Sequence, residues 1–151
     1  YDTYEWIRAS ASMPLVSKVV RLDGRLLLDG GVGDSIPLEF FESIGYERNV
    51  VILTQPKGYQ KEHLRLMPLM RIALRKYPEM IAAMERRHVM YNQQLEYVAQ
   101  AESEGRCLVI RPDGQIPIGH ISHDAGEMRQ VYEMGRSTGN RFLERVQSFF
   151  S

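Results

Sequence analysis

The sequence contains a single cysteine, Cys107, and this excludes an internal disulfide as a source of stability. No apolar run approaches the roughly 20 residues that a helix needs to cross a bilayer. Neither sign of charge dominates, because Lys plus Arg and Asp plus Glu both number 19. A balanced charge gives no support for nucleic acid or an anionic membrane as an electrostatic partner. Residues 1–6 also lack the basic and apolar regions of a signal peptide.

What remains is the composition of an ordinary globular protein. Hydrophobic residues make up 44% of the 151 residues and charged residues 25%, enough for one domain with a real core. The sequence shows no repeat, low-complexity tract or linker, so residues 1–151 are expected to form a single domain or part of one. The first residue is not methionine, and we expect the chain to be part of a longer protein. We expect its location to be cytoplasmic.

A short apolar run that ends in a carboxylate and two glycines stands out at residues 26–31. Three leucines predict the end of a buried strand, and adjacent glycines allow a sharp turn and a close approach to the backbone. Asp23-Gly24 upstream predicts a hairpin whose second strand leads to Asp29. We therefore expect Asp29 at the C-terminal edge of a sheet, on a tight loop beside a concave surface, where ligands bind in open α/β sheets. A carboxylate there is suited to act as a base, although an Asp before Gly is also a common turn residue.

Strand and helix signals alternate along the rest of the chain, so the predicted fold class is α/β. Four consecutive apolar residues within residues 49–54 predict an interior strand buried on both faces. Gly45 is predicted to close a short helix, and Asp124 to cap a later one with Glu127 three residues on. The predicted helices cover residues 4–11, 36–44, 63–100 with an interruption at Pro78, 124–134 and 140–150, and a further strand covers residues 106–110.

Residues 28–31, Leu-Asp-Gly-Gly, and residues 34–37, Asp-Ser-Ile-Pro, together resemble the aspartate motif of the patatin-like phospholipases, most closely of their bacterial branch. The small residues within 8–14 resemble the segment that precedes this motif. The resemblance extends more loosely through residues 50–54 and 107–112 to the C-terminal helices. It implies a three-layer α/β sandwich, of which this chain would form the C-terminal part with a helix-rich second half.

In that family a serine and an aspartate form a catalytic dyad that hydrolyses lipid acyl esters through an acyl-enzyme. The resemblance carries one catalytic residue to this sequence, Asp29, with Gly30 and Gly31 as the glycines that shape its loop. It implies a lipid or acyl ester substrate, transient contact with a membrane surface, and no cofactor. The family's serine elbow and glycine-rich oxyanion loop are expected upstream of Tyr1, so this chain alone is expected to be inactive.

One Gly-x-Ser-x-Gly sequence does occur, at residues 135–139 around Ser137. We reject Ser137 as the nucleophile, because this motif functions between a strand and a helix and the residues before it are helical and charged. The family's serine also precedes the aspartate, whereas Ser137 follows Asp29. Gly135 and Gly139 are expected to end one helix and admit the next.

Three other groups of residues are candidates for chemistry. His120 and His123 are too few for a metal site without further ligands, so no metal is expected. Cys107 begins an apolar strand and is expected to be a buried small side chain rather than a reactive thiol. Asp34 is expected to cap the helix near Pro37 rather than to perturb Asp29.

A rival interpretation makes the chain a non-catalytic helical protein-interaction module. Asp29 would then be only a turn residue, and the methionine-rich helices would bind a partner. Helical apolar stripes usually face a core, so most of these methionines are expected to be buried.

Overall fold

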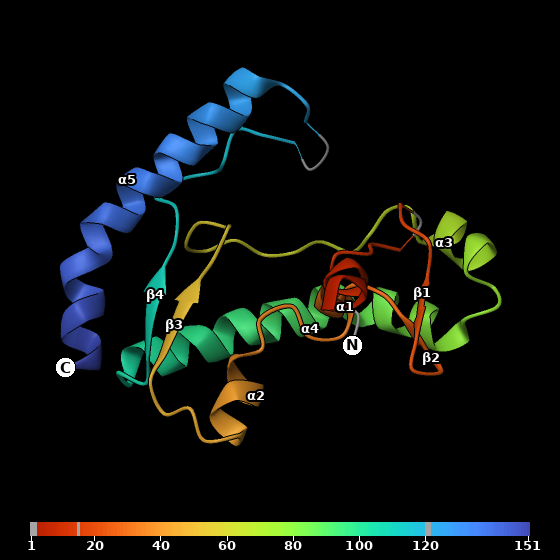
Figure 1. The fold of residues 1–151 in the computed structure, drawn as a ribbon, viewed down its shortest axis with the longest axis horizontal. Helices are drawn as coiled ribbons and strands as arrows, with labels where there is room; N and C mark the ends of the chain where they lie inside the picture. The colour runs from red at the N-terminus through yellow and green to blue at the C-terminus, as the bar shows by residue number, and fades with distance from the viewer. Residues whose placement is uncertain (1–2, 15, 120–121) are drawn as a thin grey trace. The chain divides into compact units, whose positions relative to one another are not determined.

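The computed structural model describes residues 3–14, 16–119 and 122–151, which form a mixed α/β structure with five α-helices and two small sheets (Figure 1). The chain divides into two compact units, Tyr1–Pro37 with Lys61–Leu95, and Leu38–Gln60 with Glu96–Ser151. The elements are α1 (Thr3–Ser10), β1 (Val20–Leu22), β2 (Arg25–Leu27), the 3-10 helix η1 (Gly30–Val32), α2 (Leu38–Ser43), β3 (Asn49–Ile52), α3 (Met67–Ala73), α4 (Pro78–Ser103), β4 (Cys107–Ile110) and α5 (Ala125–Phe150).

The predicted hairpin is present in the first unit and leads the chain to Asp29. β1 and β2 pair antiparallel (Figure 1), and Val20 lies opposite Leu27. Asp23-Gly24 forms the two-residue turn between them. Both turn residues have positive φ, 50° for Asp23 and 72° for Gly24. A two-residue turn of this kind matches the right-handed twist of the strands, and Asp and Gly tolerate the left-handed region that it needs.

Methionine side chains form most of one core cluster in the first unit. Met67 and Met70 of α3 and Met84 of α4 are buried together with Leu74 and with Val32 from the loop after Asp29. α3 carries a proline in its first turn and α4 begins at Pro78, positions where the missing N–H of proline costs no helical hydrogen bond. The expectation that the methionine-rich stretch is mostly core is confirmed.

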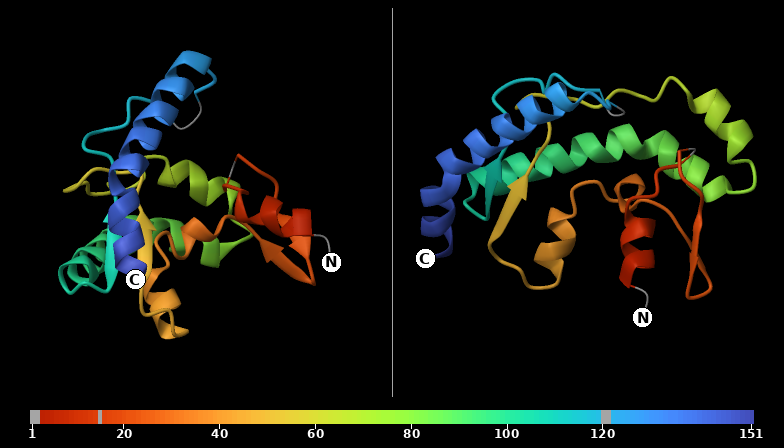
Figure 2. Two further views of the ribbon diagram at one scale, coloured as in Figure 1. Left: turned by 60° about the vertical axis from the view of Figure 1, so that its left-hand side comes forward. Right: turned by 45° about the horizontal axis from the view of Figure 1, so that its top comes forward.

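β3 and β4 form a parallel pair in the second unit, with Asn49 opposite Cys107 and Ile52 opposite Ile110. Figure 1 and the right-hand view of Figure 2 show the two strands side by side and pointing the same way. β4 is buried, but β3 is only half-buried and Ile52 is 73% exposed. Within the described residues β3 has β4 as its only strand neighbour, so the prediction of an interior strand buried on both faces is wrong. An apolar run shows which residues favour burial, but not how many strands flank them.

The C-terminal residues form one continuous helix, α5, instead of the two that were predicted. Gly135 and Gly139 lie in its interior, because a cost of about 1 kcal/mol for each glycine does not outweigh uninterrupted helical hydrogen bonding on both sides. Asp124 caps the helix as predicted, its Oδ1 accepting from Glu127 N at 2.8 Å. The Glu127 carboxylate accepts from Ser122 Oγ, so the predicted capping box is only half formed.

Gly45 ends α2 as predicted. Its φ is 98°. The amides of Gly45 and Tyr46 donate to Glu42 O and Phe41 O, which is the pattern of a Schellman motif. Among the described residues, no helix is both long enough and apolar enough to cross a membrane.

Replacing the buried Met70 with alanine is expected to lower the free energy of unfolding by about 2–5 kcal/mol, because it leaves a cavity in the methionine core. The matched control is Ile72→Ala on the same helix, since Ile72 is 69% exposed and Met70 is 3% exposed. Urea unfolding of both variants measures the difference. Equal destabilisation by the two substitutions would contradict this description of the core.

Candidate functional site

Asp29 follows the last residue of β2 by two positions and stands at the start of η1. Its backbone N–H donates to Ser12 O at 2.8 Å, and its Oδ1 accepts from Gly31 N at 2.8 Å. The side chain is half-buried. Asp29 is therefore fixed through both its backbone and its carboxylate, and the second of these bonds has the geometry of the Asx turn that the rival interpretation assumes.

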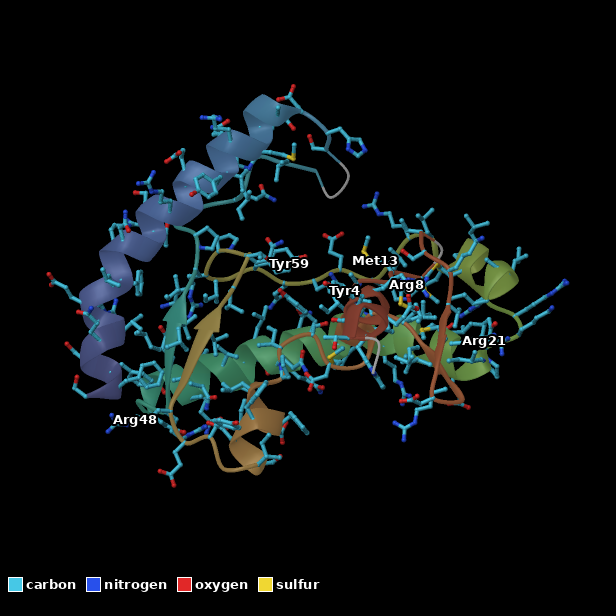
Figure 3. The ribbon with its side chains drawn as sticks, viewed as in Figure 1. Tyr4, Arg8, Met13, Arg21, Arg48 and Tyr59 are labelled. Atoms are coloured by element: carbon cyan, nitrogen blue, oxygen red, sulfur yellow. The ribbon has the colours of Figure 1, made fainter. Side chains whose placement is uncertain are left out.

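The small-residue segment at 8–14 lies directly behind Asp29. Ser12 is 4% exposed, and its Oγ donates to Arg8 O at 2.7 Å, which ties the Asp29 backbone to the last turn of α1. Figure 3 labels Arg8 and Met13, which bracket Ser12 in the sequence. The hydroxyl of Ser12 thus serves the packing of this segment.

The two glycines after Asp29 differ in what surrounds them. A Cβ on Gly31 would lie 3.1 Å from Asp29 Oδ1 and 3.9 Å from both Arg87 Nη2 and Ser35 Oγ, whereas a Cβ on Gly30 would meet nothing within 4 Å. Gly31 is therefore the position where the absence of a side chain permits close approach.

Side chains from α4 bind the other side of the same loop. Arg87 Nε donates to Gly31 O at 3.0 Å. Gln94 donates through Nε2 to Asp34 Oδ1 at 2.5 Å and accepts through Oε1 from Ile36 N at 3.0 Å. The Asp34 carboxylate binds Gln94 and α2 begins only at Leu38, so the prediction that Asp34 caps that helix is wrong. Sequence reasoning missed these contacts because they join residues 56 to 60 positions apart.

Gly31 N is the one hydrogen-bond donor to the Asp29 carboxylate among the described residues, which leaves Oδ2 available. Beside the loop is a groove of about 510 Å³, lined by Val32 and Gly33 together with residues of α4 such as Ala83 and Met90. The lining does not include Asp29 itself. Val32 and Gly33, which follow Asp29 in the same loop, therefore line a largely apolar groove.

Two family models match parts of this chain. The model described as "Patatin-like phospholipase" matches residues 1–41, the segment that contains Asp29, Gly30 and Gly31. Residues 1–41 are thus similar to patatin-like phospholipases. A model described as a domain of unknown function (DUF6363) matches residues 77–151, which include Arg87 and Gln94. No curated protein matches the chain.

The patatin-like match supports a relation to a lipid hydrolase family at the coarse level. It covers the aspartate segment and ends before β3, although the sequence suggested a looser resemblance through the strands and the C-terminal helices. Those helices instead match the domain of unknown function.

The remaining candidates show no comparable geometry. Ser137 lies inside α5, so no strand leads into it, although it lines a groove of about 650 Å³ with Thr54 and Asp113. His120 lies outside the described residues, and among those described no group of His, Cys, Asp and Glu is arranged to hold a metal ion. Cys107 is buried, and burial together with Glu102 and Glu42 raises the pKa of its thiol to about 11, so the nucleophilic thiolate is disfavoured.

Basic side chains gather near Arg87, which the sequence did not predict. The rings of His63 and His88 meet edge to face at 5.0 Å, and the Lys61 ammonium lies over the Tyr91 ring at 5.1 Å. Burial, and next the charge of Arg87, lower the pKa of Lys61.

Gly31→Ala is expected to destabilise the protein by about 1 kcal/mol relative to Gly30→Ala, because the added methyl group displaces Asp29 Oδ1 and weakens its bond to Gly31 N. Both variants remove one glycine, so the effect on the unfolded chain is matched. Urea unfolding measures the two free energies. A Gly31→Ala variant as stable as Gly30→Ala would show that the close approach is not needed.

Proposed function

We propose that this chain supplies the aspartate of a Ser-Asp dyad in a lipid acyl hydrolase of the patatin-like kind. Asp29 is the general base, and Gly30 and Gly31 shape its loop. The observation that carries the proposal is the Asp29 carboxylate within the segment matched by the patatin-like model, with Oδ1 fixed by Gly31 and Oδ2 free among the described residues. A fixed carboxylate with one free oxygen is suited to accept the proton of a serine hydroxyl.

The proposed reaction proceeds in two steps. Asp29 takes the serine proton while the serine oxygen bonds to the ester carbonyl carbon, and the proton then passes to the alcohol as the ester C–O bond breaks. Water then attacks the acyl carbonyl carbon while Asp29 takes its proton, and that proton passes to the serine oxygen as the serine–acyl C–O bond breaks, which releases the fatty acid and restores the serine. A serine hydroxyl is a weak nucleophile without such a base.

The nucleophile is proposed to lie outside these 151 residues. Ser137 belongs to the one Gly-x-Ser-x-Gly sequence in the chain, and it is in the middle of a helix. We further propose that β3 and β4 belong to the central sheet of a three-layer fold. The parallel pairing of β3 with β4 supports this, because parallel strands are typical of α/β folds.

The proposed substrate is a lipid or acyl ester, reached by transient contact with a membrane surface. The rival interaction module keeps one supporting observation, since α5 has no buried residue and exposes Tyr132, Leu143 and Phe150. The argument that the methionine-rich helices bind a partner is weakened, because Met67, Met70 and Met84 are in the core.

In the complete protein that carries this chain, Asp29→Asn is expected to lower kcat for a short acyl ester by at least about 10²–10⁴-fold. Asparagine has nearly the same shape and still accepts the hydrogen bond from Gly31 N, but it cannot take a proton. Thermal melting and ester hydrolysis are measured on the same sample. We expect a melting temperature close to that of the unmodified protein.

The two interpretations of Asp29 give opposite signatures in this experiment. A turn residue would change the melting temperature and leave activity per folded molecule intact. Normal melting with hydrolysis at the unmodified rate would show that Asp29 is not the base.

A further inference from the structure

Two side chains on one face of α4 form hydrogen bonds to the loop that carries Asp29. Arg87 and Gln94 are seven residues apart, two helical turns, so they project from the same side of the helix. Between them they bind the loop at Gly31, Asp34 and Ile36, which covers η1 and the residues that follow it. All of these contacts lie within the first compact unit.

Gly31 links the hydrogen bonds from α4 to the carboxylate of Asp29. Its N–H donates to Asp29 Oδ1 at 2.8 Å, and its carbonyl accepts from Arg87 Nε at 3.0 Å and from Ser35 Oγ at 2.5 Å. A displacement of the Gly31 carbonyl therefore also displaces the amide that orients the carboxylate. Arg87 makes no ion pair within 4.0 Å among the described residues, so its guanidinium binds this loop through the backbone.

We propose that Arg87 and Gln94 are positioning residues for Asp29. The segment that matches a domain of unknown function would then hold the aspartate loop of the patatin-like segment in its reactive geometry. This inference rests on the proposed function of Asp29. Its physical basis is that general-base catalysis requires the base within hydrogen-bond reach of the proton, and a misplacement of about 1 Å costs on the order of 10²-fold in rate.

A double-mutant cycle in the complete protein tests the inference, with kcat and KM measured for a short-chain nitrophenyl ester. Arg87→Met alone is expected to lower kcat by about 10- to 100-fold with little change in KM, because it displaces the base and not the substrate. In a protein that already carries Asp29→Asn, the same substitution is expected to change kcat by less than about threefold, because there is no base left to position. A purely structural role would give the same loss in both backgrounds.

Three further variants sharpen the result. Arg87→Lys keeps the charge but lacks the Nε–H that binds Gly31, and is expected to lose nearly as much kcat as Arg87→Met. Gln94→Met removes the two contacts at Asp34 and Ile36, and is expected to lower kcat in the same direction. The control is Arg75→Met, because Arg75 is exposed in the same unit and makes no hydrogen bond or ion pair among the described residues. Its kcat is expected to be unchanged.

The outcomes separate this inference from the proposed function. If Asp29→Asn abolishes hydrolysis while Arg87→Met and Gln94→Met keep full kcat, Asp29 is the base but α4 does not position it. If Asp29→Asn keeps full kcat, the proposed function fails and this inference fails with it. If Arg87→Met does not fold, Gln94→Met and Arg87→Lys decide, and equal losses in both Asp29 backgrounds overturn the inference.

Discussion

The hydrogen bonds of Gly31 determine the geometry of the candidate site. Its amide orients the Asp29 carboxylate, and its carbonyl receives the Arg87 guanidinium and the Ser35 hydroxyl. Only a glycine permits the approach of Asp29 Oδ1 without displacement, since a Cβ would lie 3.1 Å from it. The Ser12 segment and α4 contribute hydrogen bonds that hold this loop, and the hairpin leads the chain into it.

The two family matches do not coincide with the compact units. The patatin-like match covers residues 1–41, and the domain of unknown function covers residues 77–151. The first unit combines most of the former with the N-terminal part of α4 from the latter. The segment that matches the domain of unknown function therefore supplies part of the core, through Met84, and part of the support for Asp29, through Arg87 and Gln94.

Features set by neighbouring residues were predicted well from the sequence. The Asp23-Gly24 turn, the break between helices near Pro78, the cap at Asp124 and the helix end at Gly45 each depend on conformations available to a few adjacent residues. The same local reasoning failed at Gly135 and Gly139, where a helix of 26 residues tolerates two unfavourable positions. Long-range partners were not predictable from the sequence. Nothing near Asp34 indicates Gln94 as its partner, and nothing near Arg87 indicates Gly31. The number of strands beside β3 was mispredicted for the same reason.

The central claim is that Asp29 activates a serine other than Ser137. The most direct test treats the complete protein with a fluorophosphonate, which bonds covalently to activated serines, and locates the modified residue by mass spectrometry. We expect one modified serine, outside residues 1–151, and a rate of modification that falls by at least about 10²-fold in the Asp29→Asn variant, as loss of a general base requires. Modification of Ser137, or modification at an unchanged rate without the Asp29 carboxylate, would contradict the claim.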